Sequence, residues 1–150
     1  MRALGLDLGS KRIGVAVCDS GGTLAVPLET VGRSGDLARD HRRIAELVAE
    51  AEAEVVVVGL PLSLDGSEGP AARRARRELA ALQRALPVPV ATYDERWSTV
   101  EAEASLRAAE VGPRRRRQVI DAAAAAVILQ GWLDHRRATV AGADDDEGRP

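Results

Sequence analysis

Three acidic residues stand in apolar surroundings, far apart in the sequence. Asp7 interrupts the apolar stretch 3–8, and Asp121 precedes eight residues without a polar side chain, 122–129. Glu95, with Asp94 before it, follows the short segment 90–93. A buried carboxylate without a partner costs several kcal/mol, so we expect these acids to be hydrogen bonded, paired or bound to metal.

Three carboxylates without a nearby His or Cys make an all-oxygen site, which suits Mg²⁺ or Mn²⁺ rather than zinc. Like charges brought together raise one another's pKa unless a cation relieves the repulsion. Phosphodiester hydrolysis uses such sites, because the metal ions activate water and stabilise the attacking and leaving oxygens. We therefore predict that Asp7, Glu95 and Asp121 are both catalytic and metal-binding. Glu95 is preferred to Asp94 because its longer side chain reaches further across the sheet.

Each acid also has a simpler interpretation. Asp7 could cap the turn before Gly9, and Asp121 could complement a helix dipole for about 0.3–1 kcal/mol. Glu95 could be an exposed loop charge with Arg96 as its partner.

The elements that would position these acids can be read from the apolar patterns. Strands are predicted at 3–8, 13–18, 23–31, 55–58 and 90–93, and helices at 36–52, 70–85, 98–111 and 117–134. The first three strands form an antiparallel meander, and right-handed crossovers add the last two beyond strand 1. The predicted fold is α/β and ribonuclease H-like, with a mixed five-stranded sheet of order 3-2-1-4-5 flanked by helices. It occupies residues 1–137, and we expect the acidic segment 138–150 to be a disordered tail.

Four motifs, in this order, resemble the YqgF (RuvX) family of bacterial ribonuclease H-like proteins, which are relatives of the RuvC Holliday junction resolvases. The motifs are DLGSKRIGVA at 7–16, GLPLSLDGSEG at 59–69, YDER at 93–96 and DAAAAA at 121–126. The resemblance covers residues 3 to about 134.

This resemblance implies a metal-dependent nuclease that works in 5′-end processing of precursor 16S rRNA, on pre-ribosomal particles, with Asp7, Glu95 and Asp121 as its acidic triad. Two alternatives remain: a resolvase-like nuclease that cuts branched DNA, and a non-catalytic RNA-binding assembly factor. Trp97 departs from the family, which usually has an aliphatic residue there. It could fill the core or offer a base-stacking surface, and we favour the core.

Basic residues near the acids are candidates for phosphate contacts. Two follow Asp7 in the first turn, one follows Glu95, and four arginines lead into the Asp121 helix; a serine in the loop before a helix is a further candidate. A solvated surface is the alternative for each. The predicted nucleic-acid contacts are Lys11, Arg12, Ser63, Arg96, Arg114, Arg115, Arg116 and Arg117.

Composition narrows the remaining choices. The chain has 150 residues, a net charge of −2, one cysteine and 2% aromatic residues. A single cysteine and no bilayer-length apolar run favour a cytoplasmic protein without a membrane partner. One domain is too small for a two-domain nucleotide cleft, and few aromatics argue against a stacking platform for single strands. We expect a monomer or weak homodimer, with His41 and His135 on the surface.

Overall fold

The computed structural model describes residues 1–62, 65–97, 103 and 113–147, and of the side chains in 113–119 and 141–147 it describes none. Its elements are β1 (Ala3–Leu8), β2 (Arg12–Cys18), β3 (Ala25–Gly32), α1 (Leu37–Glu50), β4 (Val55–Leu60), α2 (Pro70–Ala85), β5 (Val90–Asp94), the short 3₁₀ helix η1 (Glu95–Trp97) and α4 (Pro113–Glu147). The predicted helix at 98–111 lies outside the described residues, apart from Glu103.

The five strands form one mixed sheet in the order β3-β2-β1-β4-β5. β1 and β3 pair with β2 in antiparallel fashion, while β4 pairs in parallel with both β1 and β5. This confirms the predicted sheet order and the ribonuclease H-like architecture.

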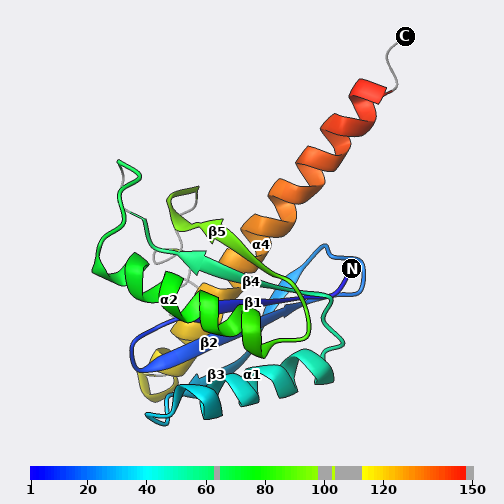
Figure 1. Cartoon of the computed structure of the whole chain (residues 1–150). Coiled ribbons are helices and arrows are strands. Elements are labelled where there is room, and N and C mark those ends of the chain that lie inside the picture. The colour runs from blue at the N-terminus through cyan, green and yellow to red at the C-terminus, as the bar shows by residue number, and fades with distance from the viewer. Residues whose placement is uncertain (63–64, 98–102, 104–112, 148–150) are drawn as a thin grey trace.

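Helices cover both faces of this sheet: α1 and α2 lie on one face and α4 on the other (Figure 1). Side chains alternate between the faces along each strand. Ala3, Ala16 and Val57 belong to the core under α4, whereas Leu4 and Val56 belong to the core under α1 and α2. Strand position therefore decides which helix layer a side chain meets.

Helix α4 approaches the sheet closely because both surfaces carry small residues. Its alanines at 122–126 are buried, and Gly5 on β1 leaves space for the helix. A Cβ at Gly5 would lie only 2.7 Å from the Cβ of Leu129. The predicted burial of the apolar run after Asp121 is confirmed.

The C-terminal segment differs from the prediction. α4 continues to Glu147, although we expected disorder after 137. Alanines at 138, 141 and 143 favour helix, and no proline interrupts the segment before Pro150. Figure 1 shows its last turns projecting beyond the sheet. Among the described residues, no helix is long and apolar enough to cross a membrane.

Candidate active site

Asp7 lies near the end of β1, on the face of the sheet that α4 covers. Strand alternation fixes this orientation, because Gly5, two residues earlier, packs under Leu129 of that helix. In the antiparallel pairing of β1 with β2, Asp7 lies opposite Gly14. The parallel register that pairs Leu6 with Val58 brings Gly59 of β4 to its other side. Both positions flanking this carboxylate therefore lack a side chain.

Asp121 lies against the first of these glycines. A Cβ at Gly14 would collide with the backbone carbonyl of Asp121 and lie 3.0 Å from the Ala122 nitrogen. The α4 backbone thus rests directly on β2 at this point. Directly opposed residues in an antiparallel pair have Cα atoms about 4.5–5.5 Å apart. Asp121 is consequently held one strand away from Asp7.

Glu95 reaches the second glycine from the first position of η1. Its Oε1 lies 3.2 Å from where a Cβ of Gly59 would be. The neighbouring Asp94 is occupied elsewhere: the Nε of Arg96 donates to both of its carboxylate oxygens, at 3.0 and 2.9 Å. These hydrogen bonds from Arg96 hold the pKa of Asp94 below its usual value. Glu95, not Asp94, is the acid that lies over the strand beside Asp7.

The carboxylate of Asp121 already has a cationic partner. The Nε of Arg12, the first residue of β2, donates to Oδ2 of Asp121 at 2.6 Å, and both side chains are partly buried. Within the described part of the chain, no three His, Cys, Asp or Glu side chains gather closely enough to hold a metal ion. The backbone thus makes neighbours of the three acids, while the Asp121 carboxylate is paired with Arg12.

A buried polar network, which the sequence analysis missed, fixes the turn between β1 and β2. Arg33 follows β3, and its Nε donates to the Gly9 carbonyl at 2.7 Å while its backbone N–H donates to the Lys11 carbonyl at 3.1 Å. Its Nη1 and Nη2 donate to the two carboxylate oxygens of Glu78 in α2, at 3.0 and 2.7 Å. His41 of α1 lies 2.7 Å from the same carboxylate. The turn that follows the first acid is therefore anchored to both helices of the opposite face.

This network also corrects one prediction. His41 is 3% exposed, so its expected surface position is wrong, and its contact with the partly buried Glu78 carboxylate explains why. Burial alone would raise the pKa of Glu78, but hydrogen bonds from Arg33 and His41 outweigh it, and the pKa falls below its usual value. No sequence signal marks the network, because its members come from three separate elements.

The other predicted nucleic-acid contacts are only partly described by the structure. Lys11 is exposed in the β1–β2 turn. Ser63 lies outside the described residues, and so do the side chains of the four arginines at 114–117, whose backbone forms the first turns of α4. Arg96 is engaged by Asp94. Trp97 is 61% exposed, so the expectation that it fills the core is wrong.

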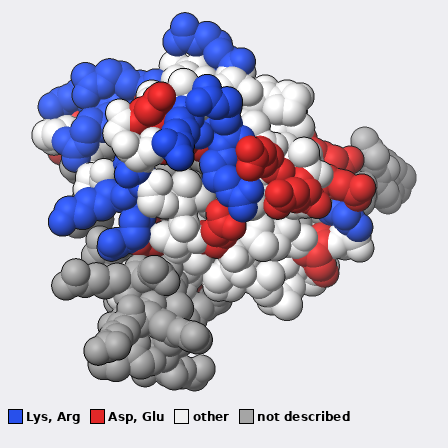
Figure 2. Space-filling view, turned by 90° about the horizontal axis from the view of Figure 1, so that it is seen from below, with Lys and Arg blue, Asp and Glu red and all other residues white. Residues whose placement is uncertain are grey.

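Basic side chains are concentrated on part of the surface. Figure 2 shows one face of the molecule with Lys and Arg gathered on one half and acidic side chains towards the other. Helices α1 and α2 carry seven exposed arginines: Arg39, Arg42, Arg73, Arg74, Arg76, Arg77 and Arg84. Such a distribution suits a polyanionic partner, despite the slightly negative net charge.

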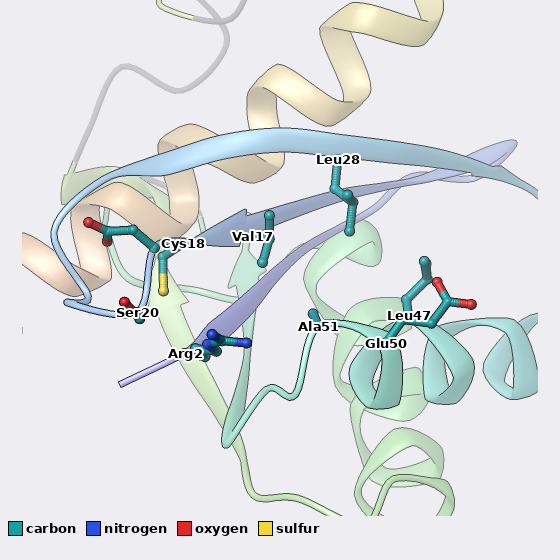
Figure 3. Close-up of a pocket in the computed structure, with 9 residues that line it drawn as sticks. Arg2, Val17, Cys18, Ser20, Leu28, Leu47, Glu50 and Ala51 are labelled. Atoms are coloured by element: carbon teal, nitrogen blue, oxygen red, sulfur yellow. The ribbon is translucent and has the colours of Figure 1, made fainter.

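Two hollows of the surface differ in their relation to the acids. The pocket in Figure 3, of about 410 Å³, is lined by Arg2 before β1, Cys18 at the end of β2 and Ala51 after α1. No predicted site residue lines it. A cleft of about 450 Å³ instead borders Gly9 and Arg33, beside the turn that follows Asp7. Only the second hollow adjoins the candidate site.

The sheet order, with helices on both faces, defines a ribonuclease H-like protein, which here carries acids on β1 and on the helix packed against it. Among solved structures, the chain is similar to Thermus thermophilus RuvC in complex with a Holliday junction substrate, with a TM-score of 0.60 and 22% identity over 93% of this chain and 97% of that one. Thermus thermophilus RuvC in a second structure gives a TM-score of 0.57 at the same identity. These likenesses show the fold.

Sequence similarity defines the family. The profile of the RuvX family, described as a Holliday junction resolvase, matches residues 1–135. A relative from Anaeromyxobacter dehalogenans is 53% identical over 136 residues, 91% of this chain and 98% of its own length. One from Streptomyces coelicolor is 51% identical over 149 residues, 98% of this chain and 87% of its own. Both carry the name "Putative pre-16S rRNA nuclease". The chain belongs to the RuvX (YqgF) family.

Proposed function

We propose that this protein is a Mg²⁺- or Mn²⁺-dependent nuclease that hydrolyses phosphodiester bonds in the 5′-end processing of precursor 16S rRNA. The observation that carries the proposal is the placement of acids around Asp7, with the Asp121 backbone on Gly14 and the Glu95 carboxylate over Gly59. The names of the relatives point to the same substrate.

The donor chemistry and the backbone positions fit a divalent metal. Asp7, Glu95 and Asp121 offer only carboxylate oxygens, the donors that Mg²⁺ and Mn²⁺ prefer. When bound, the metal would activate water and stabilise the oxygens that attack and leave. Before a metal binds, the Arg12 guanidinium is the cation that pairs with Asp121. A substrate phosphate near the Asp121 carboxylate would give the same guanidinium a second anionic partner.

The basic residues around the acids would bind the phosphate backbone. Lys11 is exposed next to Arg12 in the β1–β2 turn, and Arg33 holds the backbone of this turn in place. We include Ser63, Arg96 and the four arginines at 114–117 among the proposed contacts, as their positions in the sequence predict. Arg96 would have to share its guanidinium between Asp94 and the substrate.

We further propose that the enzyme works in the cytoplasm on pre-ribosomal particles, as a monomer or weak homodimer. Its single cysteine, Cys18, is a buried free thiol, as suits a reducing compartment. Co-sedimentation with small-subunit precursors tests the partner, and analytical ultracentrifugation tests the oligomeric state.

A second candidate activity is the resolution of branched DNA. The description of the matching family and the likeness to RuvC favour it. The two substrates can be compared directly, with precursor 16S rRNA and a four-way DNA junction offered to the same enzyme preparation.

The decisive experiment measures cleavage of both substrates by the wild type, Asp7→Asn and Asp134→Asn in Mg²⁺ or Mn²⁺. Asp134 is a matched control, because it is an exposed acid of α4 that pairs with Arg137. We expect Asp7→Asn to abolish cleavage and Asp134→Asn to retain it. Cleavage that survives in Asp7→Asn would refute the catalytic assignment. Equal binding of precursor RNA by all three proteins, with no cutting by any, would establish the assembly-factor alternative instead.

A further inference from the structure

The aromatic residues of this chain gather in one region. The chain has two Trp, one Tyr and no Phe. Tyr93 on β5 contacts Trp97 on η1, with ring centroids 5.6 Å apart and the rings nearly perpendicular at 79°. Trp132 lies on the part of α4 that packs against this end of the sheet, since Tyr93 sits directly over its neighbour Gly131. The three aromatic side chains thus lie beside one helix, and only Tyr93 is buried in a core that is otherwise aliphatic.

Tyr93 and Trp97 differ sharply in exposure. Tyr93 is buried, and its ring occupies the space that a side chain at Gly131 would need. Trp97 is 61% exposed even though it touches this fixed ring. Its buried aromatic neighbour thus leaves more than half of the Trp97 surface uncovered.

His135 adds a second ring to this surface. It stacks on Trp97 with ring centroids 5.4 Å apart and an interplanar angle of only 19°. His135 is itself exposed on α4. A planar ring that already carries one stacked partner, and still exposes most of its area, can extend the stack with another planar group.

The position of the pair relative to the acids indicates which planar group that is. Trp97 lies two residues after Glu95 in the same turn of η1. His135 lies fourteen residues after Asp121 on α4, about 21 Å away at 1.5 Å per residue. A nucleic acid strand with a phosphate at the acids spans this separation in a few nucleotides.

We propose that Trp97 and His135 form a stacking site for one unpaired nucleobase of the bound strand. As a substrate subsite, it rests on the proposed nuclease function. The low aromatic content excludes a surface that stacks several successive bases of a single strand. One base, in contrast, needs only a single exposed indole.

The test uses the two tryptophans. Trp132→Phe leaves Trp97 as the sole indole, and we expect this variant to bind as the wild type does. It is titrated in EDTA with two ten-residue oligomers, an oligoadenylate and an abasic phosphodiester chain. Oligoadenylate should quench Trp97 emission at saturation, and the abasic chain should not. By anisotropy of labelled oligomers, oligoadenylate should bind roughly tenfold more tightly than the abasic chain.

Three further variants separate stacking from a structural role. Trp97→Leu should bind both oligomers equally, Trp97→Tyr should recover part of the preference for oligoadenylate, and His135→Ala should weaken it. Thermal melts check that each variant is folded. If Trp97→Leu does not fold, His135→Ala and the quenching measurement still decide the matter.

Several results would overturn the proposal. They are an unquenched Trp97 at saturating oligoadenylate, equal affinity of the wild type for both oligomers, and an unchanged preference in folded Trp97→Leu. Any of these would leave Trp97 as a surface for some other partner, such as a protein. If Trp97 is quenched but no substrate is cleaved, the proposed nuclease function is refuted and the stacking site still stands. If precursor rRNA is cleaved but Trp97 is not quenched, only the stacking site is refuted.

Discussion

Gly14→Ala tests directly whether close packing of α4 on β2 positions the proposed site. A methyl group at Gly14 would be driven into the backbone of Asp121 and would also lie 3.0 Å from the nitrogen of Ala122. Because these are backbone atoms in the middle of a packed helix, no side-chain rotation can relieve the collision. The helix must move away from the sheet, and it carries the Asp121 carboxylate with it.

The expected effects are large for one methyl group. Overpacking of a core destabilises by about 1–3 kcal/mol, and a backbone collision belongs at the upper end. For a chain of this size, about 3 kcal/mol corresponds to a fall in Tm of roughly 6–12 °C. A displacement of about 1 Å in a catalytic group can lower activity about 100-fold. We therefore expect a folded but less stable enzyme with severely reduced cleavage.

Gly32→Ala is the matched control. Gly32 also lies in a strand, at the end of β3, but a Cβ there would meet no atom within 4 Å, and its φ is not positive. This substitution should leave cleavage unchanged and raise stability by about 0.4–1 kcal/mol, because it reduces the freedom of the unfolded chain. Thermal melts and rates of rRNA cleavage measure both effects. If Gly14→Ala matched Gly32→Ala in Tm and in rate, the contact between α4 and β2 would not position the site.

Three further predictions concern the charged groups. Arg12→Ala should tighten Mn²⁺ binding about two- to fivefold in calorimetry, since it removes the cation that competes for Asp121, and unchanged affinity would contradict this. Chelation by EDTA should abolish cleavage and added Mn²⁺ should restore it, whereas activity in EDTA would exclude metal dependence. The lowered pKa of Glu78 stabilises the fold above the usual carboxyl pKa and ceases to do so as pH falls through its folded value. Below about pH 4.5, the wild type should therefore lose Tm more steeply than Glu78→Gln; parallel curves would refute the linkage.

Local patterns were sufficient to predict the strands and their order. The short turns after 3–8 and 13–18 determine an antiparallel meander, and the apolar run at 55–58 is buried on both faces, as its composition predicts. The helix end at Glu147 was missed, because the acidic composition of the tail was taken as a sign of disorder while its alanines favour helix.

The acids themselves could be found because a carboxylate in an apolar segment is anomalous without any knowledge of the fold. Their partners could not. Arg12 and Asp121 are 109 residues apart, and only the packing of α4 on β2 brings them together. Arg33 and Glu78 likewise sit in segments whose other charged residues look the same in the sequence. Pairing of charges depends on tertiary contacts, which single-sequence patterns do not contain.

The glycines connect the fold to the proposed chemistry. Gly5 and Gly14 allow α4 to touch the sheet, and Gly59 leaves room for the Glu95 carboxylate. In an isolated strand each glycine would weaken the element, since it has no side chain to pack. Here the strand positions on both sides of Asp7 carry no side chain, so the α4 backbone can approach on one side and the Glu95 carboxylate on the other. The acids can lie close together because these glycines have no side chains to keep the elements apart. One added methyl group at Gly14 or Gly59 should therefore alter the site more than substitutions of exposed residues around it.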